Sequence, residues 1–173
     1  PSQEYKATCW ENDEATELLE GLTVAKQFLD ERNVGLRKKE YWSYSKDWLI
    51  QEGINRKRTL DFWWTFLLFY DISVIGYCEI EFYKDFEIAY LADIAIHPKY
   101  RKKGIAKWLT HQVIKEVKEK KENIRYIKTL NGSNNTAINR INDNLGFFEN
   151  NYYHKWQLNL NTLSTTNHEN EKI

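Results

Sequence analysis

The sequence has little cysteine and proline, no methionine, and no excess of charge of either sign. Two cysteines stand among 173 residues, and 25 basic side chains balance 25 acidic ones. The isolated Cys9 and Cys78 form neither a disulfide framework nor a zinc-ligand pattern, so we expect no metal and a reducing compartment. A net charge of zero excludes a global basic field for nucleic acid or an anionic membrane, so any anion site must be local.

Long hydrophobic runs are missing as well. The longest apolar stretches, such as residues 66–70, fall far short of the roughly 20 residues that a membrane span needs. The first residues lack the apolar segment of a secretory signal, which favours a cytoplasmic protein. With 42% hydrophobic and 29% charged residues, the composition is that of one globular domain, predicted over residues 1–160, with a polar tail at 161–173.

Hydrophobic periodicity predicts helices first, then strands, then an alternation of the two. We expect helices at 13–29 and 45–57, strands at 59–70, 73–83 and 87–97, a helix at 104–121, a strand at 124–130, a helix at 135–145, and one or two closing strands within 147–160. Hairpin-connected strands pair antiparallel, whereas a strand–helix–strand passage needs a parallel crossover. The pattern therefore predicts an α/β fold with one mixed sheet and helices on both faces.

The segment before the long helix concentrates positive charge. Five of the nine residues from 99 to 107 are basic: Lys99, Arg101, Lys102, Lys103 and Lys107. Backbone N–H groups at a helix start have no intrahelical partner, and Gly104 lets the backbone approach a ligand closely. These features predict an anion site that suits a diphosphate, although a surface turn with a few lysines would share the pattern. Neither GxGxxG nor GxxxxGK[ST] occurs, which excludes ordinary dinucleotide and P-loop sites.

Two blocks of sequence resemble the GNAT acetyltransferase superfamily. Residues 101–106, Arg-Lys-Lys-Gly-Ile-Ala, resemble its acyl-CoA pyrophosphate loop, [QR]-x-x-G-x-[GA], and residues 93–98, Asp-Ile-Ala-Ile-His-Pro, resemble its fourth strand. Downstream, residues 131–138, Asn142 and the Leu-Gly-Phe at 145–147 resemble its fifth strand and fourth helix. The resemblance implies a sheet of six to seven strands. It also implies direct transfer of an acetyl group from acetyl-CoA to an amine in a ternary complex.

The resemblance also implies how acetyl-CoA would bind. The pantetheine arm would lie as an extra strand against Ile94, Ala95 and Ile96, in a gap between the fourth and fifth strands. The Ile96 N–H would polarise the thioester carbonyl. Asn135 would contact the pantetheine, unless it serves as a helix N-cap. The pyrophosphate would lie in the basic cluster, which ends at Lys107. It would accept hydrogen bonds from the backbone N–H groups of Arg101, Lys102, Lys103, Gly104, Ile105 and Ala106.

The catalytic acid and base follow only in part from the resemblance. Many relatives protonate the leaving thiolate from a tyrosine seven residues after the asparagine of the fourth helix, but here that position holds Asn142. An amide cannot transfer a proton, so Asn142 would hydrogen-bond the sulfur or order a water. Alternative acids are Tyr100, Tyr126, Tyr152 and Tyr153. For the base, Glu79 and Glu81 share one strand face and Asp93 can approach them from the next strand, unless the glutamates simply face solvent.

These residues predict an N-acetyltransferase for an amine of a small molecule or peptide, acting as a monomer or homodimer. A likeness to the second half of tandem GNAT proteins and to antibiotic-modifying and mycothiol-synthase-like acetyltransferases favours a metabolite or drug acceptor. The rival is a non-catalytic acyl-CoA-binding module with a regulatory or partner role, which Asn142 favours because the usual acid is replaced. A nucleic-acid-binding module fits less well, because the chain is neutral and has a single basic cluster.

Overall fold

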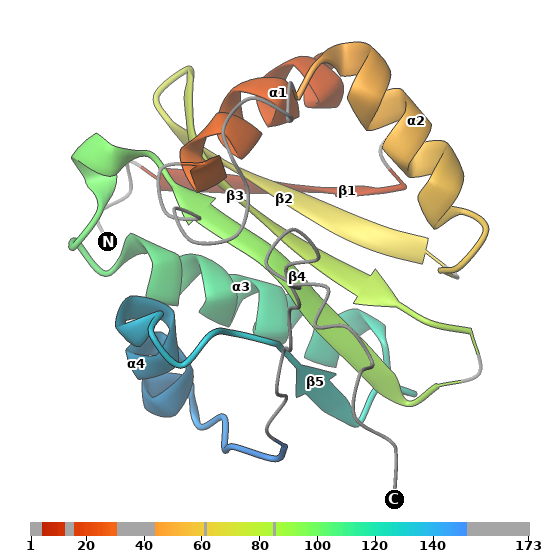
Figure 1. Ribbon diagram of the computed structural model, residues 1–173, viewed down its shortest axis with the longest axis vertical. Coiled ribbons are helices and arrows are strands. Elements are labelled where there is room, and N and C mark those ends of the chain that lie inside the picture. Colours follow the sequence, from red (N-terminus) through yellow and green to blue (C-terminus); the bar gives the residue numbers. More distant parts are fainter. Residues whose placement is uncertain (1–4, 13–15, 31–43, 61, 85, 152–173) are drawn as a thin grey trace, which may run out of the picture.

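The computed structural model describes residues 5–12, 16–30, 44–60, 62–84 and 86–151. Within these ranges one sheet of five strands runs in the order β1-β2-β3-β4-β5, between helices (Figure 1). The strands are β1 (Tyr5–Glu11), β2 (Phe62–Tyr70), β3 (Ser73–Phe82), β4 (Ile88–Ile96) and β5 (Tyr126–Lys128). The helices are α1 (Thr16–Asp30), α2 (Lys46–Arg56), α3 (Ile105–Lys120) and α4 (Thr136–Leu145), with a short 3-10 helix, η2 (Pro98–Tyr100), before α3.

Strand pairing confirms the predicted mixed sheet. The strands β1 to β4 are antiparallel neighbours, and β4 is parallel to β5 across the crossover helix α3. The described ranges hold five strands rather than the six to seven that the family resemblance implied. Residues 147–151 contain no strand. The rest of the predicted closing segment, 152–160, and the predicted tail lie outside the described residues.

The strand β1 corrects the prediction that the N-terminal third is helical. It pairs with β2 along its whole length, from Tyr5 opposite Tyr70 to Glu11 opposite Trp64. Its alternate residues Tyr5 and Cys9 pack against the core under α3. The alternation lasts for only seven residues, and an edge strand is paired on one side, so its sequence signal is weaker than that of the 15-residue helix after it.

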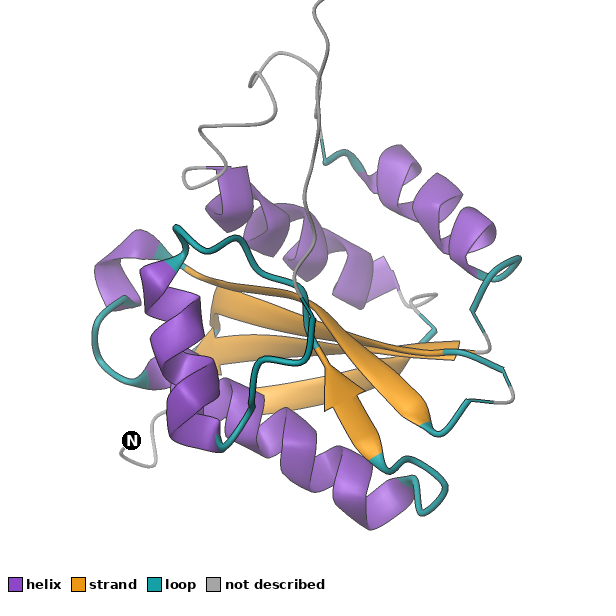
Figure 2. Ribbon diagram, turned by 60° about the horizontal axis from the view of Figure 1, so that its bottom comes forward, coloured by secondary structure: helices purple, strands orange, loops and turns teal. Residues whose placement is uncertain are grey.

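Two hydrophobic cores lie on opposite faces of the sheet (Figure 2). The helix α3 covers one face with a buried stripe of Ile105, Leu109, Val113 and Val117. The helices α1 and α2 cover the other face with Leu18, Leu19, Leu22, Ala25 and Leu49. Because successive strand residues point to opposite faces, Ile80 belongs to the α3 core, whereas Glu79 points toward α1 and α2.

A β-bulge in β4 opens the sheet beside β5. Glu79 on β3 pairs with Asp93, but the next residue, Ile80, pairs with Leu91, which leaves Ala92 as the extra residue of β4. The pairing of β4 with β5 covers only the first three residues of β4, residues 88–90. Beyond the bulge, the second half of β4 has no strand partner on that edge within the described ranges.

Candidate active site

A cleft lies in the opening between β4 and the chain that follows β5. It has a volume of about 210 Å³ and is bordered by the second half of β4, residues 129–132, α3 and α4. Its lining includes Leu91, Asp93, Ile94, Thr110, Asn135 and Asn142. Asp93 is the one acidic side chain among the described residues that line it. The cleft therefore combines apolar and amide walls with a single carboxylate.

The edge of β4 that borders the cleft offers backbone hydrogen-bonding groups. The His97 N–H donates to the Ile75 carbonyl at 2.8 Å, on the side of β3. Because N–H groups alternate between the two edges of a strand, those of Ile94 and Ile96 point to the opposite edge, toward the cleft. This is the edge against which the acyl-CoA arm was predicted to lie. The Ala95 side chain belongs instead to the core under α1.

The basic loop passes twice through the left-handed backbone region before α3 begins. Lys102 has a φ of 61° and Gly104 a φ of 77°. A Cβ built on Gly104 would meet nothing within 4 Å, so space is open above this residue. Alternating backbone conformations make successive N–H groups converge, and those of Ile105 and Ala106 start the helix without intrahelical acceptors. The loop is therefore a candidate cradle for an anion, bordered by the exposed side chains of Lys99, Lys102, Lys103 and Lys107.

Arg101 links this loop to the strand before it and to the helix α1. Its Nε donates to the Ile96 carbonyl at 2.8 Å, and its Nη2 donates to the Phe28 carbonyl at 3.0 Å. Its backbone N–H donates to the Pro98 carbonyl at 3.2 Å. The Arg101 N–H, which was predicted to hold the pyrophosphate, thus already has an acceptor within the loop, and the Arg101 side chain links the loop to β4 and to α1. The candidate anion donors begin at Lys102.

Two asparagines of the α4 segment line the cleft. Asn135 occupies the N-cap position, but its side chain makes no capping hydrogen bond to the helix. The alternative N-cap role of this amide is thus not realised in the structure. Asn142 lies two helical turns further on, and its backbone carbonyl accepts the N–H of Phe147 at 3.1 Å. Both amides are half-buried at the cleft.

Glu79 is held in buried ion pairs and is unsuited to act as a base. Its Oε2 lies 2.6 Å from Lys26 Nζ and 3.1 Å from Arg56 Nη2, and its side chain has no exposed surface. Burial alone would raise the pKa of Glu79, but attraction to Lys26 and Arg56 and their hydrogen bonds lower this pKa to about 2. Such a carboxylate takes no proton from an ammonium group near neutral pH. We therefore replace the predicted base role of Glu79 with a structural one.

Asp93 and Glu81 are both accessible to solvent. The Asp93 side chain is 37% exposed, and its Oδ2 lies 3.4 Å from Lys26 Nζ and 3.5 Å from the Tyr77 hydroxyl, which donates to it. The Glu81 side chain is 19% exposed, and its Oε2 accepts the Tyr83 hydroxyl at 3.3 Å. Burial is the main cause that raises the pKa of Glu81. Of the three predicted carboxylates, Asp93 is the one that lines the cleft.

Two basic residues of this cluster were missed by the sequence reasoning. Lys26 is 3% exposed on α1, and Arg56 is the last residue of α2. A signal for Lys26 was present, because it follows Leu22 by four residues and so lies within the apolar stripe of α1. Arg56 likewise follows the buried Leu49 by seven residues, on the same helix face. A charged residue at such a position indicates a buried partner of opposite charge.

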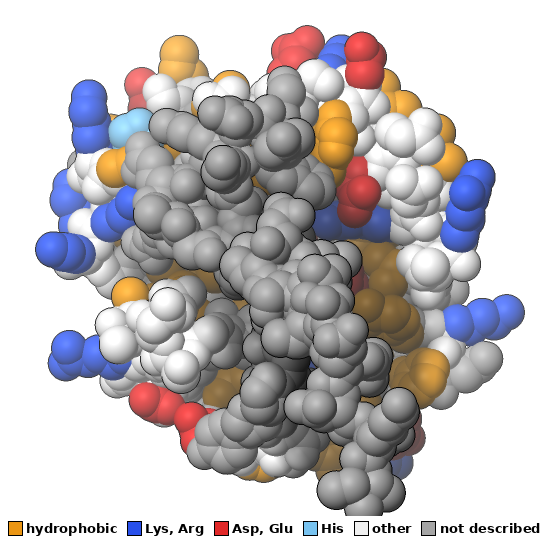
Figure 3. Space-filling model, in the orientation of Figure 1, with side chains coloured by type: hydrophobic (Ala, Val, Ile, Leu, Met, Phe, Trp, Pro, Cys, Tyr) orange, Lys and Arg blue, Asp and Glu red, His pale blue; other side chains and the backbone are white. Residues whose placement is uncertain are grey.

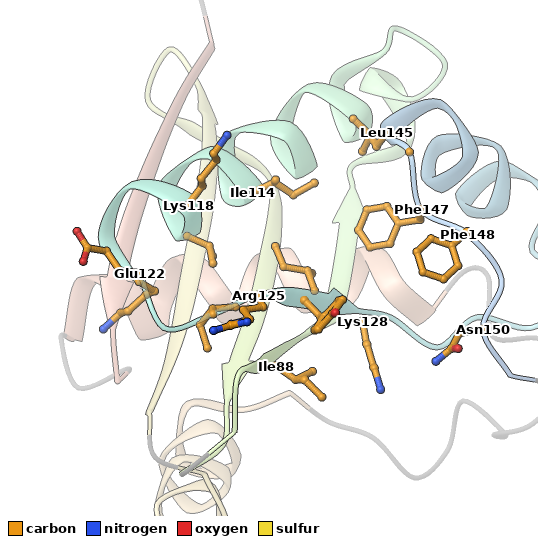
Figure 4. A pocket seen from close by; sticks show the side chains of 16 residues that line it. Ile88, Ile114, Lys118, Glu122, Arg125, Lys128, Leu145, Phe147, Phe148 and Asn150 are labelled. Carbon is orange, nitrogen blue, oxygen red and sulfur yellow. The ribbon is translucent and has the colours of Figure 1, made fainter.

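A larger cavity, of about 810 Å³, lies between the second half of α3, β5 and the segment after α4. Figure 4 shows its walls, to which α3 contributes Ile114 and Lys118, β5 contributes Lys128, and the segment after α4 contributes Phe147 and Phe148. Of the predicted site residues that the structure describes, the alternative acid Tyr126 lines this cavity, whereas Asp93, Ile94, Asn135 and Asn142 line the smaller cleft. The smaller cleft at the bulge of β4 is therefore the candidate active site.

Two other kinds of feature are absent from the described ranges. No helix there is long and apolar enough to cross a membrane. No group of three or more His, Cys, Asp and Glu side chains there could hold a metal ion.

Sequence comparison identifies the family. The profile of the Acetyltransferase (GNAT) family matches residues 23–147, which is most of the chain. The chain belongs to this family. The resemblance stated for the basic loop, β4 and α4 is thereby confirmed. The match also covers α2, β2 and β3, where the sequence holds no comparably specific motif. Among curated proteins, none is similar enough in sequence to count as a relative.

Solved structures of GNAT proteins share this fold. The aminoglycoside acetyltransferase AAC(6')-Iy, in complex with a bisubstrate analogue of CoA and acetylneamine, is 17% identical, with a TM-score of 0.61 over 89% of this chain and 99% of that one. The PaiA N-acetyltransferase of Thermoplasma acidophilum, in complex with coenzyme A, is 22% identical, with a TM-score of 0.57 over 79% of this chain and 88% of that one. A tandem GNAT protein from clavulanic acid biosynthesis is 15% identical, with a TM-score of 0.66 over 84% of this chain and 42% of that one.

Proposed function

We propose that this GNAT protein transfers the acetyl group of acetyl-CoA to an amine of a small molecule or peptide. The observation that carries the proposal is Asp93, a partly exposed carboxylate in the wall of the cleft beside the bulge of β4. The anion cradle before α3 follows on the same stretch of chain. A candidate proton acceptor and a candidate anion site thus lie at the two ends of one segment, residues 93–106.

The described residues fit acetyl-CoA. The open space above Gly104 lets a pyrophosphate approach the N–H groups from Lys102 to Ala106. The outward N–H groups of Ile94 and Ile96 would bind an extended pantetheine arm as a further strand, and the Asn135 amide would add a side-chain contact. When bound, acetyl-CoA supplies an activated acyl group.

Asp93 would accept the proton that an ammonium group must lose before its nitrogen attacks the acetyl carbon. In the transfer, the N–C bond forms and the C–S bond to CoA breaks. A thiol has an ordinary pKa near about 8.5, so its thiolate is a tolerable leaving group and no strong general acid is required. The Asn142 amide, which donates a hydrogen bond but releases no proton, would hydrogen-bond the departing sulfur.

The acceptor side of the site supports a cationic amine. On the face seen in Figure 3, a hollow beside α2 exposes hydrophobic side chains, with acidic and basic side chains at its upper end. On this side of the sheet the three carboxylates Glu79, Glu81 and Asp93 outnumber their cationic partners Lys26 and Arg56 by one, and the remaining negative charge attracts an ammonium group. The structural similarity to an aminoglycoside acetyltransferase supports the same class of acceptor, a small molecule with several amines.

A second candidate function is that of a non-catalytic acyl-CoA-binding module. The observation that favours it is Asn142, which stands where many relatives of this family carry the tyrosine acid. The anion cradle serves either function. Turnover therefore separates the two candidates, whereas CoA binding does not.

The test measures thiol release from acetyl-CoA across a panel of aminoglycosides, polyamines and peptides, beside the thermal shift caused by CoA. We expect turnover with at least one amine, and a drop of about 100-fold or more in kcat for Asp93→Asn with the CoA shift retained. A matched control is Asp71→Asn, because Asp71 lies in the exposed β2–β3 turn with a φ of 54°, which asparagine tolerates well. A CoA shift without turnover on any amine would support the module, and no shift would overturn both functions.

A further inference from the structure

The helix α1 places a buried ammonium group between two carboxylates of neighbouring strands. Lys26 is 3% exposed, and its Nζ lies 2.6 Å from Glu79 Oε2 and 3.4 Å from Asp93 Oδ2. The same Nζ lies 5.0 Å from the centre of the Tyr77 ring, whose hydroxyl donates to Asp93. Lys26 thus links the interior of the sheet to the carboxylate in the wall of the cleft.

Glu79 does not need Lys26 for a cationic partner. The Arg56 guanidinium donates two hydrogen bonds to it, from Nη1 to Oε1 at 3.2 Å and from Nη2 to Oε2 at 3.1 Å. Asp93 is less well held, because its described hydrogen-bond donors are Lys26 and the more distant Tyr77 hydroxyl. Glu79 is therefore shared between Lys26 and Arg56, whereas Lys26 is the cation that Asp93 depends on.

We propose that Lys26 is a positioning residue, which uses Glu79 as its anchor and holds the Asp93 carboxylate at the cleft for proton transfer. This inference rests on the proposed function, because it assigns Lys26 a role that acts through Asp93. An ammonium group has three N–H donors, so it can satisfy both carboxylates at once. Burial alone would lower the pKa of Lys26, but attraction to Glu79 and then Asp93 raises it, so the link stays charged at neutral pH.

The geometry explains why the bridge would matter for rate. Asp93 lies beside a bulge, on the half of β4 that has no second strand partner within the described ranges, so its carboxylate can rotate away from the cleft. A small misplacement of a reacting group costs up to about 100-fold in rate. A hydrogen bond between charged groups contributes enough to reduce such rotation. Lys26 is not itself a lining residue of the cleft and reaches it through Asp93, so its loss should change kcat more than the affinity for CoA.

The test is a double-mutant cycle with Lys26→Met and Asp93→Asn, using an amine that the panel identifies. We expect Lys26→Met to lower kcat by about 10- to 100-fold with CoA affinity unchanged within about twofold. The double variant should be no slower than Asp93→Asn alone, because Lys26 acts only through that carboxylate. The control is Lys115→Met, which removes an exposed lysine of α3 and should leave kcat unchanged.

Lys26→Met leaves a buried carboxylate with one cation fewer, so its fold is checked by circular dichroism and thermal unfolding. If it fails to fold, Lys26→Met combined with Glu79→Gln removes the cation and its anchoring charge together, while Asp93 still loses its bridge. A folded variant with unchanged kcat would overturn the inference about Lys26, as would losses in rate that simply multiply in the double variant. If Asp93→Asn alone leaves kcat unchanged, the base role in the proposed function fails, and the inference fails with it.

Discussion

Replacing Gly104 by glutamate should abolish CoA binding while leaving most of the fold in place. The position has a φ of 77°, and a Cβ there would meet nothing within 4 Å, so the new side chain fits the free protein. It would, however, extend into the open space above the cradle, where the pyrophosphate is proposed to lie. The left-handed backbone costs a residue with a Cβ about 1–2 kcal/mol, which lowers stability but need not unfold the chain.

The electrostatic part of this effect can be worked out. A carboxylate about 4 Å from a negative phosphate oxygen, at an effective dielectric constant of about 20, is repelled by about 4 kcal/mol. Since about 1.4 kcal/mol is a factor of ten, the affinity for CoA should fall by roughly a thousandfold before any steric effect. Gly104→Gln carries the same backbone strain and nearly the same volume without the charge. It should therefore retain more affinity than Gly104→Glu.

Titration calorimetry with CoA, accompanied by circular dichroism, measures the prediction. A matched control is Gly146→Glu, because Gly146 has a φ of 84° and also leaves nothing within 4 Å of a Cβ, but it lies at the end of α4, outside the basic loop. This control should lose similar stability and keep its CoA affinity. A folded Gly104→Glu variant with unchanged affinity would show that the loop does not bind the pyrophosphate, and the acetyl-CoA assignment would fall.

Two further predictions concern stability. The pKa of Glu79 is lowered from its ordinary 4.5 to about 2, so its ionised form stabilises the folded state above about pH 4.5, and this stabilisation is lost as pH falls through about 2. Glu79→Gln should therefore unfold more easily than the native protein by roughly 3 kcal/mol at neutral pH, and urea titrations should show this difference vanishing near pH 2; a constant difference would refute the charge pairing. Gly76→Ala should lower the melting temperature and weaken CoA binding, because its Cβ would lie 2.7 Å from the Ala95 carbonyl oxygen and push on β4; an unchanged melting temperature would contradict this close approach.

Much of the fold could be predicted because its causes are local. The helix expected at 104–121 is α3, Ile105–Lys120, and the one expected at 45–57 is α2, Lys46–Arg56. Apolar residues at helical spacing and aromatic or β-branched runs at strand spacing impose these elements within a few residues. The edge strand β1 was missed, because its short alternation gains its meaning only from pairing with β2, more than 50 residues later in the chain.

The sequence by itself determined the family, and it indicated the candidate anion loop and the candidate carboxylates on β3 and β4, because motif spacing and strand alternation are readable along the chain. Only the tertiary structure decided what each charge does. Glu79 and Asp93 are both acidic strand residues and look alike in sequence. In the structure, Glu79 forms buried ion pairs with Arg56 and with Lys26, which precedes it by 53 residues, whereas Asp93 lies beside the bulge of β4 at the cleft. Arg101 belongs to the motif, but its guanidinium donates hydrogen bonds to carbonyl groups of α1 and β4. The pKa of a group and the direction of its side chain depend on partners brought close by folding, and no local pattern encodes those distances.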